Sequence, residues 1–323
     1  METTQVRALK LYIHAGYTKT GTTAIQGHFA SYRTQYLDQG LLYPMTGLLP
    51  GEPKHYCLSF PFTAHASTST PMQPRPAGFK AGNAKVLFEE LYSEVIESSA
   101  TSVLISSEEF FEIPKQKITE LSEVIRSWSC NVSSVKIVFY LRRHDKWLES
   151  GFNQAEKITA VPVWGMSLFD YTLYMLGQRG TDYLNVLNDW ASVFGIGNII
   201  VRPYQKEELV NGSTIDDMCS LLEVIPHDSS QGKDADPNRS LSTAELYFVG
   251  LARRSLSPDI SAKVVQAIML QTASGDMPSH GIVPVGYGTF SEYQRNAIWN
   301  MYWRDYVKIA RLYLGKAHLF AKP

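Results

Sequence analysis

Short hydrophobic runs recur along the first two thirds of the chain. Their length and their content of β-branched and aromatic residues predict buried strands at Leu9–Ala15, Ser102–Ile105, Val135–Leu141 and Asn198–Val201. Helical spacing of apolar positions separates these runs, roughly at Thr22–Asp38, Asn83–Ser98, Lys117–Trp128, Asp145–Ile158 and Asp182–Phe194. Strands that alternate with helices predict βαβ units, and therefore an α/β fold with a mostly parallel central sheet flanked by helices.

The last third of the chain has helical spacing without a clear strand. We expect helices at Ser242–Arg254, Asp259–Thr272 and Ser291–Leu314. Neither an internal repeat nor a flexible linker divides the sequence. This predicts a single domain over residues 1–323, with an α/β core at 9–210 and a helical C-terminal part at 240–315.

Composition narrows the class of protein. Hydrophobic residues make up 44% of the chain, enough for a sizeable core, and the formal net charge of −1 argues against a nucleic-acid partner. The three cysteines form no CxxC pair, so neither a disulfide framework nor a zinc site is expected, and the compartment should be reducing. The sequence contains no signal-peptide pattern and no apolar run long enough for a membrane span, which predicts a cytoplasmic protein.

A glycine-bounded segment, Gly16–Thr23, lies between the first strand and the first helix. Such a turn aims backbone N–H groups and the positive end of a helix dipole at one point, which is how proteins bind phosphate groups. Lys19 adds a full charge. An ordinary helix cap at Thr20 or Thr22 is the alternative. The segment is not a Walker A loop, because Thr22 stands where that pattern has its lysine.

This loop resembles the 5′-phosphosulfate loop of sulfotransferases that use 3′-phosphoadenosine-5′-phosphosulfate (PAPS), particularly bacterial-type and carbohydrate sulfotransferases. Thr18 departs from the family, which usually has proline there, and this affects the stiffness of the loop. The resemblance implies a P-loop-like sulfotransferase fold, a nucleotide-binding core at 9–210, PAPS as co-substrate and 3′-phosphoadenosine-5′-phosphate (PAP) as product. The implied nucleotide-binding residues of the loop are Tyr17, Thr18, Lys19, Thr20, Gly21, Thr22 and Thr23.

A second motif follows the strand at Val135–Leu141. The family has an arginine at the end of this strand and a serine eight residues later, and both bind the 3′-phosphate of PAPS; Arg142 and Ser150 match them. Arginine pairs bidentately with phosphate, and strand ends converge above a parallel sheet. The alternative is a surface arginine pair, Arg142 and Arg143, with a solvated serine. By resemblance, Tyr204 is expected to contact adenine.

The transfer chemistry needs a charge on the leaving phosphate and a general base for the acceptor hydroxyl. Lys19 suits the first role. Glu108 is the first candidate for the base and Glu109 the second, because carbohydrate sulfotransferases have a glutamate in the corresponding place. The alternative is an acid that merely begins the next helix. The family generally needs no metal, and the sequence shows no cluster with metal-ligand spacing.

The histidines have lesser roles in this interpretation. We expect His14 to be packed in or behind the first strand and His28 to be at an exposed position, whereas His55 and His65 are reserve candidates for the base.

Two other functions stay open at this point. A P-loop-like small-molecule kinase would need magnesium and an acid at a strand end, for which Asp145 and Glu108 are the candidates. A non-catalytic nucleotide-binding protein would have kept the loop and lost the base. The acceptor could be a sugar, a small alcohol or a phenol. The proline-rich segment at 43–80 is predicted as a substrate-side loop. Four aromatics predict either an acceptor pocket or a packed helix face: Trp164, Phe169, Tyr171 and Tyr174.

Overall fold

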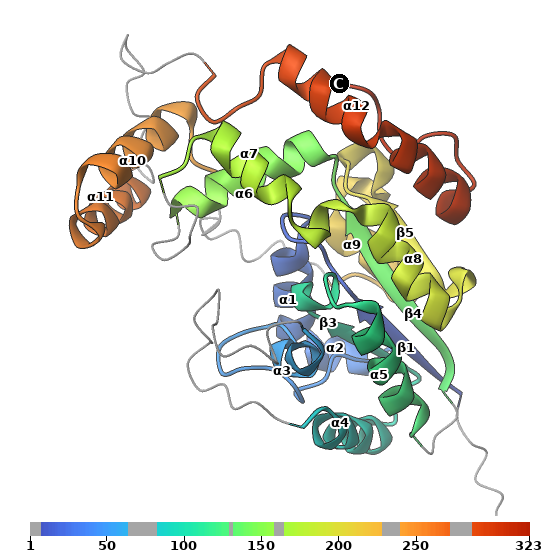
Figure 1. The fold of residues 1–323 in the computed structure, drawn as a ribbon. Helices are drawn as coiled ribbons and strands as arrows, with labels where there is room; N and C mark the ends of the chain where they lie inside the picture. Colours follow the sequence, from blue (N-terminus) through green and yellow to red (C-terminus); the bar gives the residue numbers. More distant parts are fainter. Residues whose placement is uncertain (1–7, 64–82, 129–131, 158–164, 228–239, 272–285) are drawn as a thin grey trace, which may run out of the picture. The chain divides into compact units, whose positions relative to one another are not determined.

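The computed structural model describes residues 8–63, 83–128, 132–157, 165–227, 240–271 and 286–323. A five-stranded parallel sheet forms within this part of the chain, in the order β2-β3-β1-β4-β5 (Figure 1). Its strands are β1 (Leu9–His14), β2 (Leu41–Leu42), β3 (Ser102–Ser106), β4 (Val132–Leu141) and β5 (Ile199–Pro203). The predicted α/β fold is confirmed. Strand β2 escaped prediction because two residues are too few to give a hydrophobic run.

The strand order contains a switch point between β1 and β4. From β1 in the middle, the chain continues to β2 and β3 on one side and then to β4 and β5 on the other. The connections that follow β1 and β4 therefore leave in opposite directions from neighbouring strands. Open α/β sheets bind ligands beyond the carboxyl ends of the strands at such a switch point.

One face of the sheet is covered by α1 (Thr22–Ser31), α2 (Arg33–Leu37) and α9 (Thr214–Leu222). Alternate strand residues, Tyr12 and Tyr140 among them, point to this face and share one buried cluster with Phe29 of α1. The single helix predicted for this region is broken at Tyr32, whose φ of −108° and ψ of 27° lie outside the helical region. Helix α1 therefore ends before this residue and α2 begins after it.

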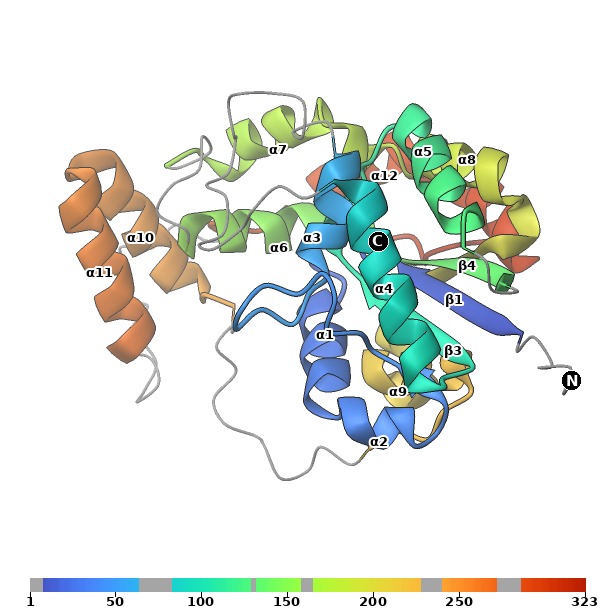
Figure 2. The same ribbon diagram turned by 90° about the horizontal axis from the view of Figure 1, so that it is seen from below.

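The opposite face is covered by α5 (Lys115–Arg126) and α8 (Tyr183–Phe194), which lie side by side (Figures 1 and 2). Phe139 of β4 faces Trp190 of α8 and Phe111, with ring centroids 6.0 and 5.7 Å away. Asp182 caps α8 by accepting a hydrogen bond from the Asn185 N–H. Farther out lie α3 (Tyr56–Ser59) and α4 (Ala84–Ser98).

The chain divides into two compact units, each described here by itself. The first comprises Met1–Arg142, Asp182–Ser229 and Asp305–Leu319, and it contains the whole sheet. The second comprises Arg143–Thr181, Ser230–Arg304 and Phe320–Pro323. This division does not test the single-domain organisation, which stays a prediction.

The second unit is helical in its described part. It contains α6 (His144–Lys157), α7 (Leu168–Leu176), α10 (Thr243–Ser255), α11 (Pro258–Gln271) and most of α12 (Glu292–Ile309). Ser242 and Glu245 form a capping box at the start of α10. Helix α12 runs into a π-helical turn at Ala310–Leu314 in the first unit. The predicted helical C-terminal third is confirmed.

A buried ion pair joins two helices of the second unit. Glu156 of α6 and Arg253 of α10 are both buried, with Arg253 Nε 3.6 Å from Glu156 Oε2. Burial raises the pKa of the Glu156 carboxyl to about 7, although Arg253 acts in the opposite direction.

No helix in the described ranges has both the length and the apolar character needed to cross a membrane.

Candidate functional site

The glycine-bounded loop forms a tight turn between β1 and α1 in the first unit. Lys19 and Gly21 have positive φ angles of 65° and 81°, and the Thr20 hydroxyl donates to the Tyr17 carbonyl. A left-handed lysine costs free energy, of the order of 1 kcal/mol, and such residues concentrate at functional sites. The N-cap of α1 is Gly21, and no side chain caps the helix there. The alternative of a cap at Thr20 or Thr22 is therefore wrong, and the helix presents its first N–H groups toward the loop.

Two glycines of this segment are required by close packing. A Cβ atom on Gly16 would lie 2.2 Å from Thr22 Cγ2 and 2.7 Å from His14 Nε2. A Cβ atom on Gly21 would lie 3.1 Å from Tyr204 Cε2 and would also be strained by the positive φ angle. The loop is thus packed tightly against the end of β1 on one side and against the Tyr204 ring on the other.

Arg142, at the end of β4, joins this loop. Its Nη1 donates to the Lys19 carbonyl over 2.9 Å, and its guanidinium carbon lies 5.4 Å from the centroid of the Tyr204 ring. The Tyr183 hydroxyl in turn donates to the Arg142 carbonyl over 2.9 Å. Lys19, Arg142 and Tyr204, which were predicted from separate parts of the sequence, are therefore neighbours. Burial lowers the pKa of the Lys19 amine, Glu108 raises it, and Arg142 lowers it further.

Glu108 approaches the same loop from the end of β3. Its Oε1 accepts a hydrogen bond from the Thr22 hydroxyl. Burial raises the pKa of the Glu108 carboxyl; the bond from Thr22 lowers it, Glu109 raises it, and Lys54 and Lys19 lower it, leaving the pKa above its ordinary value. Glu108 is also the first residue of a short 3₁₀ turn, Glu108–Phe110. The alternative, an acid that begins the next helix, therefore also holds for its local structure.

Glu109 points to a different set of partners. Its Oε1 lies 2.8 Å from Lys54 Nζ, and its Oε2 accepts from the Ser107 hydroxyl. Burial alone would lower the pKa of the Lys54 amine, but the charge and hydrogen bond of Glu109 raise it on balance. Of the two adjacent glutamates, Glu108 contacts the glycine-bounded loop through Thr22, and Glu109 is held in an ion pair.

The remaining loop residues differ in what they could offer a ligand. Tyr17 is buried, with its ring 4.2 Å from that of Phe111 and 5.4 Å from that of Tyr183. Its side chain belongs to the core, and its backbone is the part that could contact a nucleotide. Thr18 and Thr23 are exposed.

A layer of buried polar side chains lies beneath the loop, and of its members the sequence analysis had placed only His14 in the interior. The Ser106 hydroxyl lies 2.8 Å from His14 Nδ1 and accepts from Gln26 Nε2 over 3.2 Å. His14 is fully buried, as expected, and burial lowers its pKa to about 3. His28 is also buried, with Nε2 2.6 Å from the Tyr36 hydroxyl, so its predicted exposed position is wrong. Amphipathic spacing cannot separate a buried histidine from an exposed one on a short helix.

His55, a reserve candidate for the base, belongs to this buried layer. Its Nδ1 accepts from the Ser106 N–H over 3.0 Å, which leaves the proton on Nε2, and Nε2 donates to the Pro44 carbonyl over 3.0 Å. Burial lowers the pKa of His55 to about 4. Both ring nitrogens are engaged by the backbone, so the geometry disfavours His55 as a base. His65 and Trp164 lie outside the described residues.

Ser150 lies on α6 in the second unit and is partly buried. Because Arg142 belongs to the first unit, the pairing of these two residues at one phosphate stays a prediction. Of the aromatics predicted for an acceptor pocket or a helix face, Tyr171 is buried on α7 with its ring 5.8 Å from that of Phe152, and Phe169 is exposed. Tyr171 therefore packs against its neighbour within the second unit.

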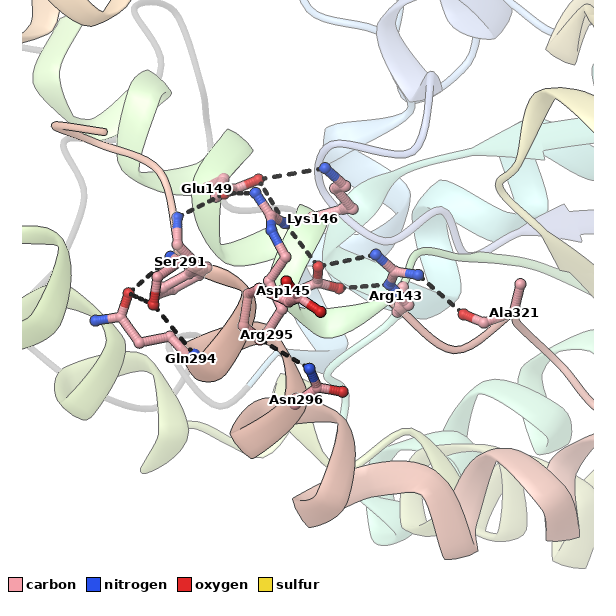
Figure 3. Close-up of polar contacts among 11 residues, drawn as sticks. Arg143, Asp145, Lys146, Glu149, Ser291, Gln294, Arg295, Asn296 and Ala321 are labelled. Carbon is pink, nitrogen blue, oxygen red and sulfur yellow. Dashed lines mark hydrogen bonds and ion pairs between the residues drawn. The ribbon is translucent and has the colours of Figure 1, made fainter. Parts of the chain in front are cut away.

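The residues after Arg142 form an ion-pair cluster of the second unit (Figure 3). Arg143 Nε lies 2.6 Å from Asp145 Oδ1, and Arg143 Nη1 donates to the Ala321 carbonyl over 2.9 Å. Arg295 of α12 pairs with both Asp145 and Glu149. Arg143 is therefore partly buried and paired, which corrects its reading as a surface residue. Burial would raise the pKa of the Asp145 carboxyl, but the bonds from Arg143 and Arg295 lower it on balance.

Over the ranges that the structure describes, histidine, cysteine, aspartate and glutamate side chains form no group of three or more that could hold a metal ion.

No protein-family model matches the chain. An uncharacterized protein of Archaeoglobus fulgidus is 30% identical over 169 residues, which is 52% of this chain; the match spans 43% of the length of that relative. Among solved structures, a sulfotransferase from Alicyclobacillus acidocaldarius shows a likeness over 82% of this chain and 96% of that chain, at 13% identity and a TM-score of 0.35.

Proposed function

We propose that this protein is a sulfotransferase that moves the sulfuryl group of PAPS to a hydroxyl acceptor. The observation that carries the proposal is the hydrogen bond from Arg142 Nη1 to the Lys19 carbonyl. It brings a second cation against a phosphate-binding loop that already contains one. A ligand with two separated anionic groups would use both cations, whereas a single phosphate would need only the loop.

The side chains around this bond suit the parts of such a nucleotide. The first N–H groups of α1, together with Lys19 and Thr22, would bind the 5′-phosphosulfate. Arg142 would bind the 3′-phosphate, for which a guanidinium offers bidentate hydrogen bonds. The Tyr204 ring, already beside the guanidinium, would stack against the adenine. Ser150 is proposed as a further donor to the 3′-phosphate.

The transfer would proceed in line. A lone pair of the acceptor oxygen forms the new bond to sulfur while the bond from sulfur to the bridging oxygen breaks, and that electron pair stays on the 5′-phosphate of PAP. The acceptor proton passes to Glu108, whose raised pKa brings it closer to the pH of the reaction. Lys19 and the loop N–H groups offset the charge that develops on the leaving phosphate.

The kinase alternative is less well supported by the contacts of its candidate acids. A magnesium site would need an acid free to face the metal, yet Asp145 is paired with Arg143 and Arg295. Glu108 accepts from Thr22, and its neighbour Glu109 is paired with Lys54, so among the described residues these contacts bring no second acid to the loop. A non-catalytic nucleotide-binding protein would not need a carboxyl with a raised pKa beside the loop.

Ligand-dependent thermal unfolding tests the proposal. A ligand at 100 times its Kd adds about 2.7 kcal/mol of stability to the folded protein. PAP should therefore raise the unfolding temperature without magnesium. The rise should exceed that with AMP, or with ATP and magnesium, because PAP has the 3′-phosphate that Arg142 would bind. Lys19→Ala should reduce this shift, while Lys115→Ala, at an exposed site on α5, should not. A larger shift with ATP and magnesium than with PAP would contradict the proposal.

A further inference from the structure

Thr22 joins the phosphate-binding loop to the candidate base. It is the first residue of α1, immediately after the loop, and its hydroxyl donates to Glu108 Oε1 at the end of β3. Its methyl group packs against Gly16, where a Cβ atom would lie only 2.2 Å away. The side chain is buried, so its orientation is fixed by this packing.

A threonine hydroxyl has one proton and can donate one hydrogen bond at a time. A phosphate group held by the first N–H groups of α1 would lie beside the first residue of that helix and would be the stronger acceptor, since it carries the greater charge. The hydroxyl can therefore donate to Glu108 or to the bound phosphate, but not to both.

We propose that Thr22 is a positioning residue that holds Glu108 in the ligand-free protein and releases it when a phosphate oxygen accepts the Thr22 hydroxyl bond. This inference rests on the proposed function of the site. It would link binding of the sulfuryl donor to removal of the acceptor proton, since the base becomes available only when the donor is bound. Transfer of the hydroxyl bond, rather than movement of a chain segment, would be the coupling event.

Transfer of the Thr22 hydrogen bond from Glu108 to the phosphate changes the pKa of Glu108. The charged groups that face Glu108 are Lys19 from the loop after β1, Lys54 ahead of α3, and the adjacent Glu109. Loss of the Thr22 bond removes one influence that lowers the pKa of Glu108, and the arriving phosphate charge raises it further. The bound form therefore holds a proton up to a higher pH than the free form does. Between these two pH values, PAP binding should be accompanied by proton uptake at Glu108, and above the higher of them the bound carboxylate stays ionised and can act as the base.

Titration calorimetry with PAP in two buffers of different ionisation enthalpy measures that uptake directly. Thr22→Val keeps the branched shape that packs against Gly16 and removes the hydroxyl, whereas Thr22→Ser keeps the hydroxyl. In Thr22→Val the free protein already lacks the bond, so uptake per PAP should fall by about half or more. Thr22→Ser should retain the wild-type uptake. Glu108→Gln defines the part that belongs to Glu108, and thermal unfolding verifies that each variant is folded.

The outcomes separate the inference from the function on which it rests. If wild-type protein does not bind PAP, the proposed function fails and the inference fails with it. If PAP binds but uptake is the same in Thr22→Val as in wild type, the inference is overturned while the proposed function stands. Uptake in Glu108→Gln equal to wild type would overturn it as well, and that result is available even if Thr22→Val does not fold.

Discussion

Replacement of Arg142 by alanine should distinguish a nucleotide that has a 3′-phosphate from one that lacks it. In the proposed complex, Arg142 binds the 3′-phosphate of PAP. Adenosine 5′-phosphosulfate has no 3′-phosphate, so it should use the loop and Lys19 alone. The variant also loses the hydrogen bond from Arg142 Nη1 to the Lys19 carbonyl, which would affect both ligands.

The two effects differ in size. A charge-assisted, bidentate pair with phosphate contributes roughly 2–4 kcal/mol, or about 30- to 1,000-fold in affinity. The bond to the Lys19 carbonyl contributes about 1 kcal/mol, or about fivefold. Arg142→Ala should therefore weaken PAP by at least about 30-fold and adenosine 5′-phosphosulfate by no more than about fivefold.

Titration calorimetry with both nucleotides provides the comparison. Arg126→Ala is the matched control, because Arg126 is an exposed arginine at the end of α5. It should leave both affinities unchanged. Equal losses for the two nucleotides in Arg142→Ala would refute the assignment of Arg142 to the 3′-phosphate.

Three further predictions follow from the same contacts. Lys19→Ala should lower turnover more than it weakens PAPS binding, since the charge is needed most on the leaving phosphate; normal turnover at saturating PAPS would remove Lys19 from the mechanism. Glu108→Gln should retain PAP affinity and lose about 100-fold or more in turnover, whereas Glu109→Gln should cost little; the reverse order would transfer the role to Glu109. Glu156→Gln should alter the pH dependence of unfolding. The folded protein holds the Glu156 proton up to a pH of about 7 and the unfolded chain releases it near 4.5, so wild-type stability should fall by up to about 3 kcal/mol as the pH rises through that window. Denaturant unfolding of the variant should lack this loss, and identical pH profiles would contradict the raised pKa that burial gives to the Glu156 carboxyl.

The part of the site that could be predicted from the sequence follows from the geometry of parallel sheets. Arg142 comes directly after a hydrophobic run, whereas Glu108 and Lys19 follow such runs by three and four residues. Because parallel strands end at one edge, residues at such positions converge even when they are far apart in the sequence. The divergence of Glu108 and Glu109 was likewise predictable, since adjacent side chains point in different directions.

Other features depend on tertiary packing that no local pattern encodes. His28 and His55 are both buried, His28 beside Tyr36 of α2 and His55 beside Ser106 of the distant strand β3. The break at Tyr32 interrupts a segment whose apolar spacing continues on both sides. The nine-residue helix α9 was not predicted, although Thr214 at its start lies close to Gly21 of the loop.

Sulfuryl transfer from labelled PAPS tests the central claim most directly. The purified protein would be incubated with PAPS labelled on sulfur and with sugars, small alcohols and phenols as acceptors, without added metal, and both PAP and the sulfated product would be measured. The account predicts label in at least one hydroxyl product, with PAP formed in equal amount, and loss of both in Lys19→Ala and Glu108→Gln. Transfer that persists in both variants, or a protein that binds PAP but transfers no label to any acceptor class, would contradict it.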